Sequence, residues 1–305
     1  MKKIAIILSF TLLGFNLYAS NGESAGSFLR MGAGAKSSAM GEAYSSVIDG
    51  ADVVYYNPAG VVFAGSKKLS FSHMSYIEST YYDTLYYTHS INENKSLGGG
   101  IQYFSYGSID ETDPSGTKVG SYSPKDIAVT MAYSMKIDSK YSFLNGAGVG
   151  ISAKYINLKV KDSATAFAGD IGFMTPVINK KFRSSLVLQN IGTKIKFDDK
   201  KEKLPLTFKT GFSYTPLKEL LATADIAFPN DSDAYFSVGS AYRRHINSMN
   251  VVLRAGYNGL NKDIGGFSGF NFGVGFEFSK ICVDYAFMPY GDMGTGHRVG
   301  VSFSF

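Results

Sequence analysis

The chain of 305 residues lacks tryptophan, and it contains one cysteine, Cys282, and only 8 prolines. A single cysteine cannot form an intramolecular disulfide, so a small domain stabilised by disulfides is excluded. Beyond the N-terminus no run of about 18 apolar residues occurs, which excludes a helical membrane protein. Stability must therefore come from another source, and a closed, hydrogen-bonded sheet would supply it.

The sequence also lacks the common signatures of catalysis and of nucleic-acid binding. Its formal charge is +5, but no basic block with interleaved aromatic residues stands out, so nucleic acid is not an expected partner. The histidines have no metal-ligand spacing, and neither a Gly-x-Ser-x-Gly nor a phosphate-loop motif occurs. We expect no catalytic, cofactor-binding or metal-binding residues and predict that the protein is not an enzyme. The histidines are His73, His89, His245 and His297.

The N-terminus has the pattern of a secretory signal peptide. Lys2 and Lys3 precede an apolar run over residues 4–13, and small residues follow at Ala19 and Ser20. This pattern predicts cleavage near Ala19 and export across the inner membrane. A membrane anchor helix is the alternative, but it needs about 20 apolar residues, and this run is interrupted by polar ones. We therefore assign residues 1–19 to a cleavable signal peptide.

Glycine, phenylalanine and tyrosine are abundant, and from residue 66 to the end the sequence alternates between apolar and polar residues. Between Phe270 and Phe278 every second residue is apolar, and those between are Asn271, Gly273, Gly275 and Glu277. Such a period of two predicts strands with one apolar and one polar face. Fourteen are expected, at about 68–77, 81–91, 95–107, 124–137, 144–158, 165–175, 181–193, 205–215, 219–228, 234–244, 248–258, 268–279, 281–288 and 296–305. Cys282 and the carboxylates Asp170, Asp225, Glu277 and Asp284 fall on polar faces.

The lengths of these strands and of their connections favour a membrane barrel. Strands of about ten residues suit a tilted bilayer crossing, and tight turns after even-numbered strands alternate with longer connections after odd-numbered ones. The first hairpin, near residues 78–80, is a short exception. A soluble β-sandwich is the alternative, but the polar faces hold few of the Lys and Glu residues that an exposed sheet needs. Tyrosines near strand ends are expected to form interfacial girdles: Tyr76, Tyr81, Tyr106, Tyr122, Tyr214 and Tyr290.

Residues 20–65 have a different pattern and precede the barrel at 66–305. They are too few and too polar for a core of their own, whereas a ring of fourteen strands is wider than its own side chains can fill. We expect this segment to form a hatch inside the lumen, with a short helix around Ser38–Ile48. Met40, Ala43, Tyr44 and Val47 would share one face of that helix.

Three motifs of this segment carry a family resemblance. They are Phe28-Leu29-Arg30-Met31-Gly32-Ala33-Gly34-Ala35, Ala39-Met40-Gly41-Glu42-Ala43-Tyr44 and Tyr55-Tyr56-Asn57-Pro58-Ala59-Gly60. Together they resemble the N-terminal signature of the PorV/PorQ outer-membrane proteins, and Asn-Pro-Ala is similar to the hatch motif of FadL fatty-acid transporters. The run from Asp284 to Gly294, followed by His297-Arg298-Val299, resembles the closing hairpin of the same family.

The resemblance implies an all-β, closed antiparallel transmembrane barrel of about fourteen strands with an N-terminal lumenal hatch. It implies a type IX-like secretion component of the outer membrane of a diderm bacterium, which binds or shuttles exported cargo or contacts a secretion pore. A FadL-like channel for hydrophobic small molecules and a purely structural barrel are the alternatives. The expected partners include outer-membrane lipid and the barrel-assembly machinery, which would read Val301, Phe303 and Phe305. The expected hatch residues are Arg30, Gly32, Gly34, Gly41, Asn57, Pro58, Ala59 and Gly60.

Overall fold

The computed structural model describes residues 24–65, 67–141, 144–197 and 200–305. The signal peptide predicted at residues 1–19 lies outside these ranges. No helix in the described ranges is both long enough and apolar enough to span a membrane.

Fourteen antiparallel strands of the described chain close into one ring, in which the last strand pairs with the first. The order around the ring is β1-β18-β17-β16-β15-β14-β13-β12-β9-β8-β7-β6-β3-β2. Each predicted strand matches one of them, so the predicted barrel is confirmed. Their bounds are Lys68–Ser75 (β1), Tyr81–Asn92 (β2), Lys95–Ser105 (β3), Lys125–Lys136 (β6), Gly148–Lys159 (β7), Ser163–Met174 (β8), Phe182–Gly192 (β9), Thr207–Leu217 (β12), Leu220–Pro229 (β13), Tyr235–Ile246 (β14), Met249–Asn258 (β15), Phe270–Phe278 (β16), Ile281–Pro289 (β17) and Thr295–Ser304 (β18).

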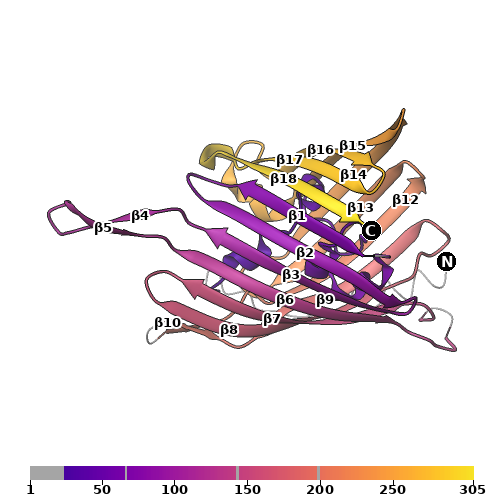
Figure 1. The fold of residues 1–305 in the computed structure, drawn as a ribbon, viewed down its shortest axis with the longest axis horizontal. Coiled ribbons are helices and arrows are strands. Elements are labelled where there is room, and N and C mark those ends of the chain that lie inside the picture. The colour runs from indigo at the N-terminus through magenta and orange to yellow at the C-terminus, as the bar shows by residue number, and fades with distance from the viewer. Residues whose placement is uncertain (1–23, 66, 142–143, 198–199) are drawn as a thin grey trace.

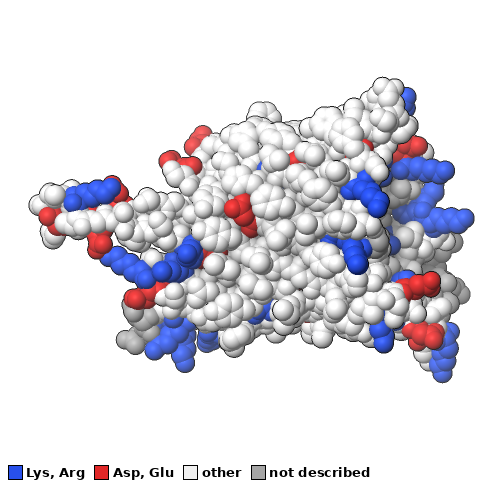
Figure 2. Space-filling model, viewed as in Figure 1, with Lys and Arg blue, Asp and Glu red and all other residues white. Residues whose placement is uncertain are grey.

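The wall turns its apolar face outward. In β16, for example, Phe270, Phe272 and Phe276 are exposed, while Asn271 between them is buried. Figure 2 shows that the middle of one side of the molecule carries almost no Lys, Arg, Asp or Glu, and that these residues gather at the two ends. A closed barrel with an apolar outer belt is the form in which strands cross a lipid bilayer. The outward aromatic and aliphatic residues therefore form the membrane-facing surface.

The connections differ between the two ends of the barrel. One end, which we call the outer end, carries two hairpins, β4–β5 (Ile109–Thr112 and Lys118–Tyr122) and β10–β11 (Ile195–Phe197 and Lys200–Glu202). The short helices η3 (Gly259–Ile264) and η4 (Gly291–Met293) lie in connections of the same end. The β4–β5 hairpin projects well beyond the wall (Figure 1).

The opposite end, the inner end, carries the tight turns after β2, β12, β14 and β16, as the sequence predicts. One connection there, between β6 and β7, is longer than expected, because β7 begins at Gly148 and not near residue 144. Two connections at the outer end are short, the β1–β2 turn over residues 76–80 and the β7–β8 turn over residues 160–162. The tight turns and the long connections that the sequence predicts otherwise lie at the expected ends.

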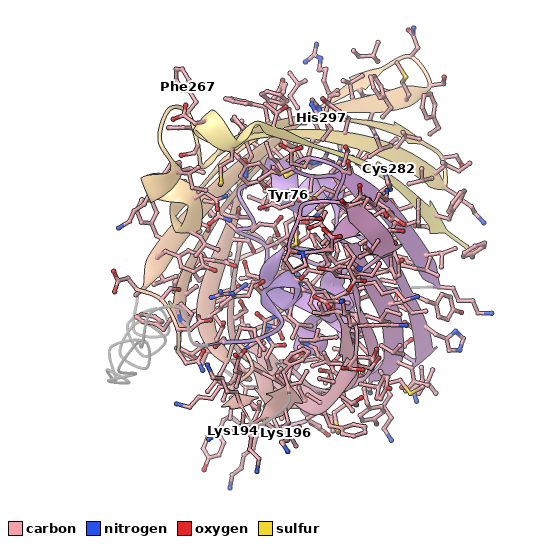
Figure 3. All side chains as sticks on the ribbon, turned by 90° about the vertical axis from the view of Figure 1, so that its left-hand side faces the viewer. Tyr76, Lys194, Lys196, Phe267, Cys282 and His297 are labelled. Atoms are coloured by element: carbon pink, nitrogen blue, oxygen red, sulfur yellow. The ribbon has the colours of Figure 1, made fainter. Side chains whose placement is uncertain are left out.

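Residues 24–65, which we call the N-terminal segment, lie inside the ring (Figure 3). The segment begins at the outer end, where the Ala25 amide donates to the Lys203 carbonyl at 3.0 Å, and it reaches β1 at the inner end. Most of its side chains are buried. Its helix α2 packs against β15 to β18, and η2 packs against β3, β6, β7 and β8. Its elements are η1 (Ser27–Arg30), α2 (Ala35–Ala39), α3 (Val53–Tyr56) and η2 (Pro58–Phe63).

The helix predicted around Ser38–Ile48 is wrong in its position. The helix α2 ends at Ala39, because the two residues after Met40, Gly41 and Glu42, have φ values of +65° and +63°. These angles lie in the left-handed region, which ends a right-handed helix. Met40, Tyr44 and Val47 are nevertheless buried together in one apolar cluster. The apolar spacing thus correctly indicates which residues are buried, although this segment does not form a helix.

Candidate functional site

Asn57 connects two parts of the N-terminal segment to the barrel wall. Its side-chain Oδ1 accepts a hydrogen bond from the Ala59 amide at 3.0 Å. Its Nδ2 donates to the Ser45 carbonyl at 3.3 Å and to the Phe173 carbonyl of β8 at 3.2 Å. Pro58, whose fixed φ suits the first position of a helix, begins η2 directly after it. The Asn-Pro motif therefore starts this helix and fixes it against the wall.

Gly41 allows the backbone of the N-terminal segment to touch the wall. A Cβ atom at this position would lie 2.5 Å from the carbonyl oxygen of Tyr257 in β15. Together with its φ of +65°, this close approach admits only glycine without a backbone shift. The other motif glycines, Gly32, Gly34 and Gly60, leave room for Glu42, Asp52 and Val53, respectively.

Two charged residues of the wall bind the backbone and side chains of the N-terminal segment. The Asp225 carboxylate of β13 accepts hydrogen bonds from the amides of Tyr44 at 3.2 Å and Ser45 at 2.9 Å. Arg298 of β18, five strands further around the ring, is fully buried. It donates to the Ser38 hydroxyl at 2.8 Å and to the Met31 carbonyl at 3.1 Å. Hydrogen bonds to charged groups are stronger than neutral ones, so these residues are principal anchors of the segment.

Further buried charges pair within the lumen. Arg254 of β15 lies 2.8 Å from Asp284 of β17, and Lys36 of α2 lies 3.2 Å from Asp49 and 4.0 Å from Asp284. Cys282, predicted to face the lumen, is buried, and its thiol donates to Asp284 at 3.2 Å. Pairing offsets the cost of removing these charges from water. The predicted lumenal position of Asp284 is therefore confirmed.

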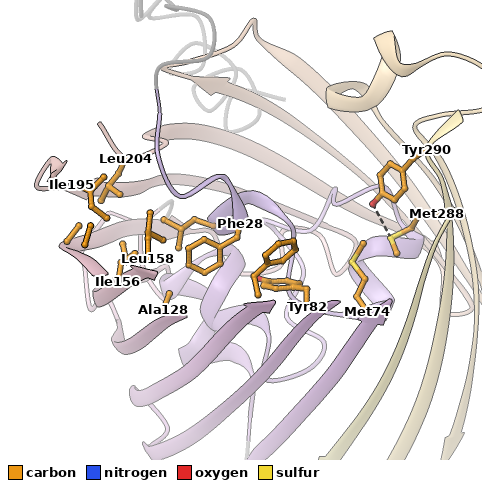
Figure 4. Packing of buried hydrophobic residues seen from close by; sticks show 14 residues of the cluster. Phe28, Met74, Tyr82, Ala128, Ile156, Leu158, Ile195, Leu204, Met288 and Tyr290 are labelled. Atoms are coloured by element: carbon orange, nitrogen blue, oxygen red, sulfur yellow. Dashed lines mark hydrogen bonds between the residues drawn. The ribbon is translucent and has the colours of Figure 1, made fainter. Parts of the chain in front are cut away.

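A cavity of about 350 Å³ opens beside η1 at the outer end; we call it the outer cavity. Aromatic side chains form much of its lining: Phe28, Tyr76, Phe104, Tyr106 and Tyr290. Phe28 also packs on wall residues deeper in the lumen, and the Tyr290 hydroxyl points to the sulfur of Met288 (Figure 4). Burial raises the pKa of Tyr76, Tyr106 and Tyr290, so their hydroxyls remain uncharged. The cavity therefore offers ring faces and neutral hydroxyl groups to a ligand, beside three asparagines and the charged side chains of Arg30 and Glu42 in the same lining.

The position of these tyrosines corrects the predicted girdle. Tyr290 is buried, and its ring meets that of Tyr76 edge-on at a centroid distance of 5.2 Å. Both residues follow the end of a strand. The alternation that predicts whether a side chain points outward or into the lumen no longer holds there, and both side chains turn inward. Tyr214, by contrast, is exposed. Arg30, which also lines the cavity, lies 2.6 Å from Asp231 in the β13–β14 connection.

The C-terminal residues complete the seam of the barrel. Val301 and Phe303 pair with Phe71 and Leu69 of β1, and the Phe305 amide donates to the Lys67 carbonyl at 3.0 Å. These three residues, which are the predicted assembly signal, thus lie at the C-terminal end of the closing strand. Whether the assembly machinery reads them stays a prediction.

Within the described ranges, no group of three or more His, Cys, Asp or Glu side chains could hold a metal ion. The histidines stand apart from the lumen contacts described above. His73 lies 2.7 Å from Asp83, and His297 lies 2.7 Å from the Tyr285 hydroxyl, both on the exposed side of the wall.

Comparison with known families identifies the chain. The family described as type IX secretion system protein PorV matches residues 21–219, which is more than half of the sequence. The chain belongs to the PorV family. The match includes the complete N-terminal segment and the wall as far as β12. No curated protein matches the sequence.

Solved structures place the PorV-family chain in a FadL-like fold. The toluene transporter TodX of Pseudomonas putida superposes with a TM-score of 0.59 at 14% identity, covering 90% of this chain and 98% of that one. A FadL homologue of Pseudomonas aeruginosa gives a TM-score of 0.54 at 9% identity, with the same coverage of 90% and 98%. These similarities show a shared outer-membrane barrel fold.

The sequence reasoning missed the basic residues that fill the lumen of this PorV-family barrel. Arg254, Arg298 and Lys154 are all buried, and Lys154 pairs with Asp170 at 2.9 Å. The alternation of the strands indicates that such basic residues face the lumen, since Arg298 precedes the outward residue Val299 and must point inward. Basic residues on the polar faces could therefore have been read as partners of the carboxylates.

Proposed function

We propose that this protein is a component of a type IX secretion system that binds exported cargo proteins at its outer end. Membership of the PorV family is the observation that carries the proposal. The occupied lumen supports it as well, because residues 24–65 fill the space that a polypeptide would need to pass through. Cargo would therefore contact the rim and the outer loops.

The β4–β5 hairpin is the part of the outer end best suited to contact a partner protein. It extends beyond the wall (Figure 1) and exposes the apolar residues Ile109 and Val119. Exposed apolar residues on a projecting hairpin are a common feature of protein-binding surfaces. Either cargo or a larger secretion pore would bury them.

The same proposal extends to the route by which the protein reaches its site. It would be exported through the inner membrane by the segment at residues 1–19, and the assembly machinery would insert it into outer-membrane lipid through Val301, Phe303 and Phe305. Its function would rest on binding and not on catalysis.

Affinity isolation tests the proposal. The tagged protein is extracted gently from outer membranes, and co-purified proteins are identified by mass spectrometry. We expect secreted proteins that share a C-terminal domain, or a large secretion pore. The Val119→Glu variant should reduce their recovery several-fold, whereas Phe267→Glu, in another exposed loop of the same end, should not. Failure of the unaltered protein to recover such partners would contradict the proposal.

The outer cavity favours a second candidate function, a channel or carrier for hydrophobic small molecules. Its aromatic lining would suit an apolar ligand, and Tyr290 and Phe104 would contact it. Lipid extracts of the purified protein provide the test. Recovery of a defined apolar compound, lost in Tyr290→Ala, together with an absence of protein partners, would favour this function over secretion.

A further inference from the structure

A second cavity, which we call the inner cavity, opens at the inner end and has a different chemistry. Its volume is about 420 Å³, and it lies between the N-terminal segment and the inner ends of β9 and β12 to β15. Its walls contain six basic residues and only two acidic ones. Figure 2 shows Lys and Arg side chains gathered at this end of the barrel. The inner cavity is therefore suited to a negatively charged ligand.

Arg183 of β9 is the residue that distinguishes this cavity. It is only 9% exposed and lines the cavity, and its guanidinium lies 5.0 Å from the centroid of the Phe63 ring. Its Nε atom is buried and, among the described residues, has no hydrogen-bond partner. No acidic side chain of the described chain forms an ion pair with it, and a buried charge without a counter-charge is unfavourable.

The other arginines at the cavity already have acidic partners. Arg254 pairs with Asp284 at 2.8 Å, and Arg243 pairs with Glu277 at 2.9 Å. Arg183 therefore remains the arginine of the cavity with donors available to a ligand. The planar guanidinium favours carboxylate or phosphate groups, which it can bind through two parallel hydrogen bonds.

The remainder of the lining is largely apolar near Arg183. The apolar part of the lining consists of Val47 and Ile48 of the N-terminal segment and the lumen-facing wall residues Leu221, Ala241 and Val252. The basic residues Lys68, Lys181 and Lys218 also contribute to the lining. A ligand that satisfies both parts would join an apolar body to a single anionic group.

We propose that the inner cavity binds a small amphipathic anion, whose carboxylate or phosphate group pairs with Arg183 and whose apolar part lies against Val47 and Leu221. The site is at the opposite end from the surface proposed to bind cargo. This proposal is therefore independent of the proposed secretion function. Fatty acids and monoalkyl phosphates share the required chemistry, and the experiment below distinguishes them.

Calorimetric titration of the full chain in nanodiscs tests the proposal. Octanoate and octyl phosphate are compared with octanol, which lacks the charge, and with inorganic phosphate, which lacks the apolar part. We expect at least one of the two amphipathic anions to bind at least tenfold more tightly than octanol and inorganic phosphate. The preferred anion identifies the head group. Equal binding of octanol, or equal binding of inorganic phosphate, would overturn the proposal.

Variants locate the site. Arg183→Gln should weaken binding of the preferred anion at least tenfold, and Arg183→Lys should restore part of it. Arg244→Gln is the matched control, because Arg244 is exposed on β14 at the same end but does not line the cavity. An equal loss in Arg183→Gln and Arg244→Gln would show that only the general charge of this end matters, and the assigned site would be wrong.

A further variant retains the arginine and so covers the case in which Arg183→Gln does not fold. Ser213 of β12 pairs directly with Arg183 across the β9–β12 ladder. Ser213→Asp would place a carboxylate beside the guanidinium and occupy it from within the protein. We expect this variant to fold, as judged by heat-modifiable gel migration, and to lose binding of the anion. Unchanged binding in folded Ser213→Asp protein would contradict the role of Arg183.

Discussion

The fourteen wall strands pair with neighbours on both sides, whereas residues 24–65 contain only short helices and turns. Each wall strand is held by a ladder of backbone hydrogen bonds, and the β1–β18 seam leaves the ring without an edge. In lipid such closure is required, because every unpaired amide or carbonyl is costly there. The arrangement of the wall strands is thus fixed by many equivalent backbone hydrogen bonds.

The N-terminal segment is held in place by individual side-chain contacts. Asn57 and Gly41 contact the wall from the segment, and Asp225 and Arg298 contact the segment from the wall. Because each contact has its own geometry, the loss of one is not made up by an equivalent neighbour. We therefore expect substitutions in these contacts to destabilise the protein more than comparable substitutions on the outer face of the wall.

The largest effect should follow Gly41→Val. The substitution adds a branched side chain at a left-handed φ, directly against the Tyr257 backbone, so the segment must move away from β15. We expect a loss of about 3 kcal/mol in the free energy of unfolding, from overpacking and backbone strain together. Denaturant titration in lipid vesicles, followed by gel migration, measures it. Protease cleavage within residues 24–65 should also increase.

Gly116→Val provides the control for this prediction. Gly116 also has a positive φ, of +84°, but a Cβ atom there would have nothing within 4 Å. It lies in the turn of the β4–β5 hairpin, outside the ring. A loss of stability in Gly116→Val as large as that in Gly41→Val would mean that backbone strain alone, and not contact with the wall, accounts for the effect.

Asp225→Ala should have the next largest effect. It leaves the buried amide of Ser45 without its acceptor and leaves the Tyr44 amide with the Glu42 carbonyl alone. An unsatisfied buried group costs about 1–3 kcal/mol. We expect a total loss of about 2–3 kcal/mol in the same titration. Asp225→Asn keeps one acceptor oxygen and should lose less. Equal losses in the two variants would show that the carboxylate does not act by accepting these bonds.

Asn57→Ala should have a smaller effect. It removes the cap of η2 and the donor to the Phe173 carbonyl, and loss of a cap costs about 0.5–2 kcal/mol. We expect a loss of about 1–2 kcal/mol, with increased protease access to residues 58–65. Asn57→Ser keeps an acceptor for the Ala59 amide without adding a charge, so it should lose less than Asn57→Ala. A stability of Asn57→Ser no higher than that of Asn57→Ala would contradict the capping role.

The same difference explains which features the sequence predicts. Wall strands are predictable because the alternation is local: Phe270 to Phe278 shows which side chains face outward without knowledge of any partner. The contacts of the N-terminal segment join distant residues, such as Ser38 and Arg298, which are 260 positions apart. No local pattern contains that pairing. The family motif marked Asn57 and Gly41 as special residues, but not the wall groups that they meet.

Two errors show where local patterns fail. The helix expected over residues 38–48 has suitable apolar spacing, yet Gly41 and Glu42 adopt left-handed φ values. Gly41 lies against the Tyr257 backbone of the wall, and Glu42 accepts hydrogen bonds from Ser38 and Tyr56 of the segment. Tyr290 was expected at the membrane interface, but it lies after the end of β17 and turns into the outer cavity. Alternation is informative within a strand and loses its meaning one residue beyond it.

The smallest effect should follow Asp83→Ala, on the outer face of the wall. Asp83 contacts His73 at 2.7 Å, but their side chains are 31% and 50% exposed, and exposed ion pairs contribute about 0–1 kcal/mol. Asp83→Ala and Asp225→Ala make the same chemical change, so the two variants compare an outer position with one that holds the segment. We expect Asp83→Ala to lose less than about 1 kcal/mol in the vesicle titration. If it lost as much as Asp225→Ala, individual side-chain contacts would matter equally on both faces of the wall, and the N-terminal segment would not depend on them more than the barrel does.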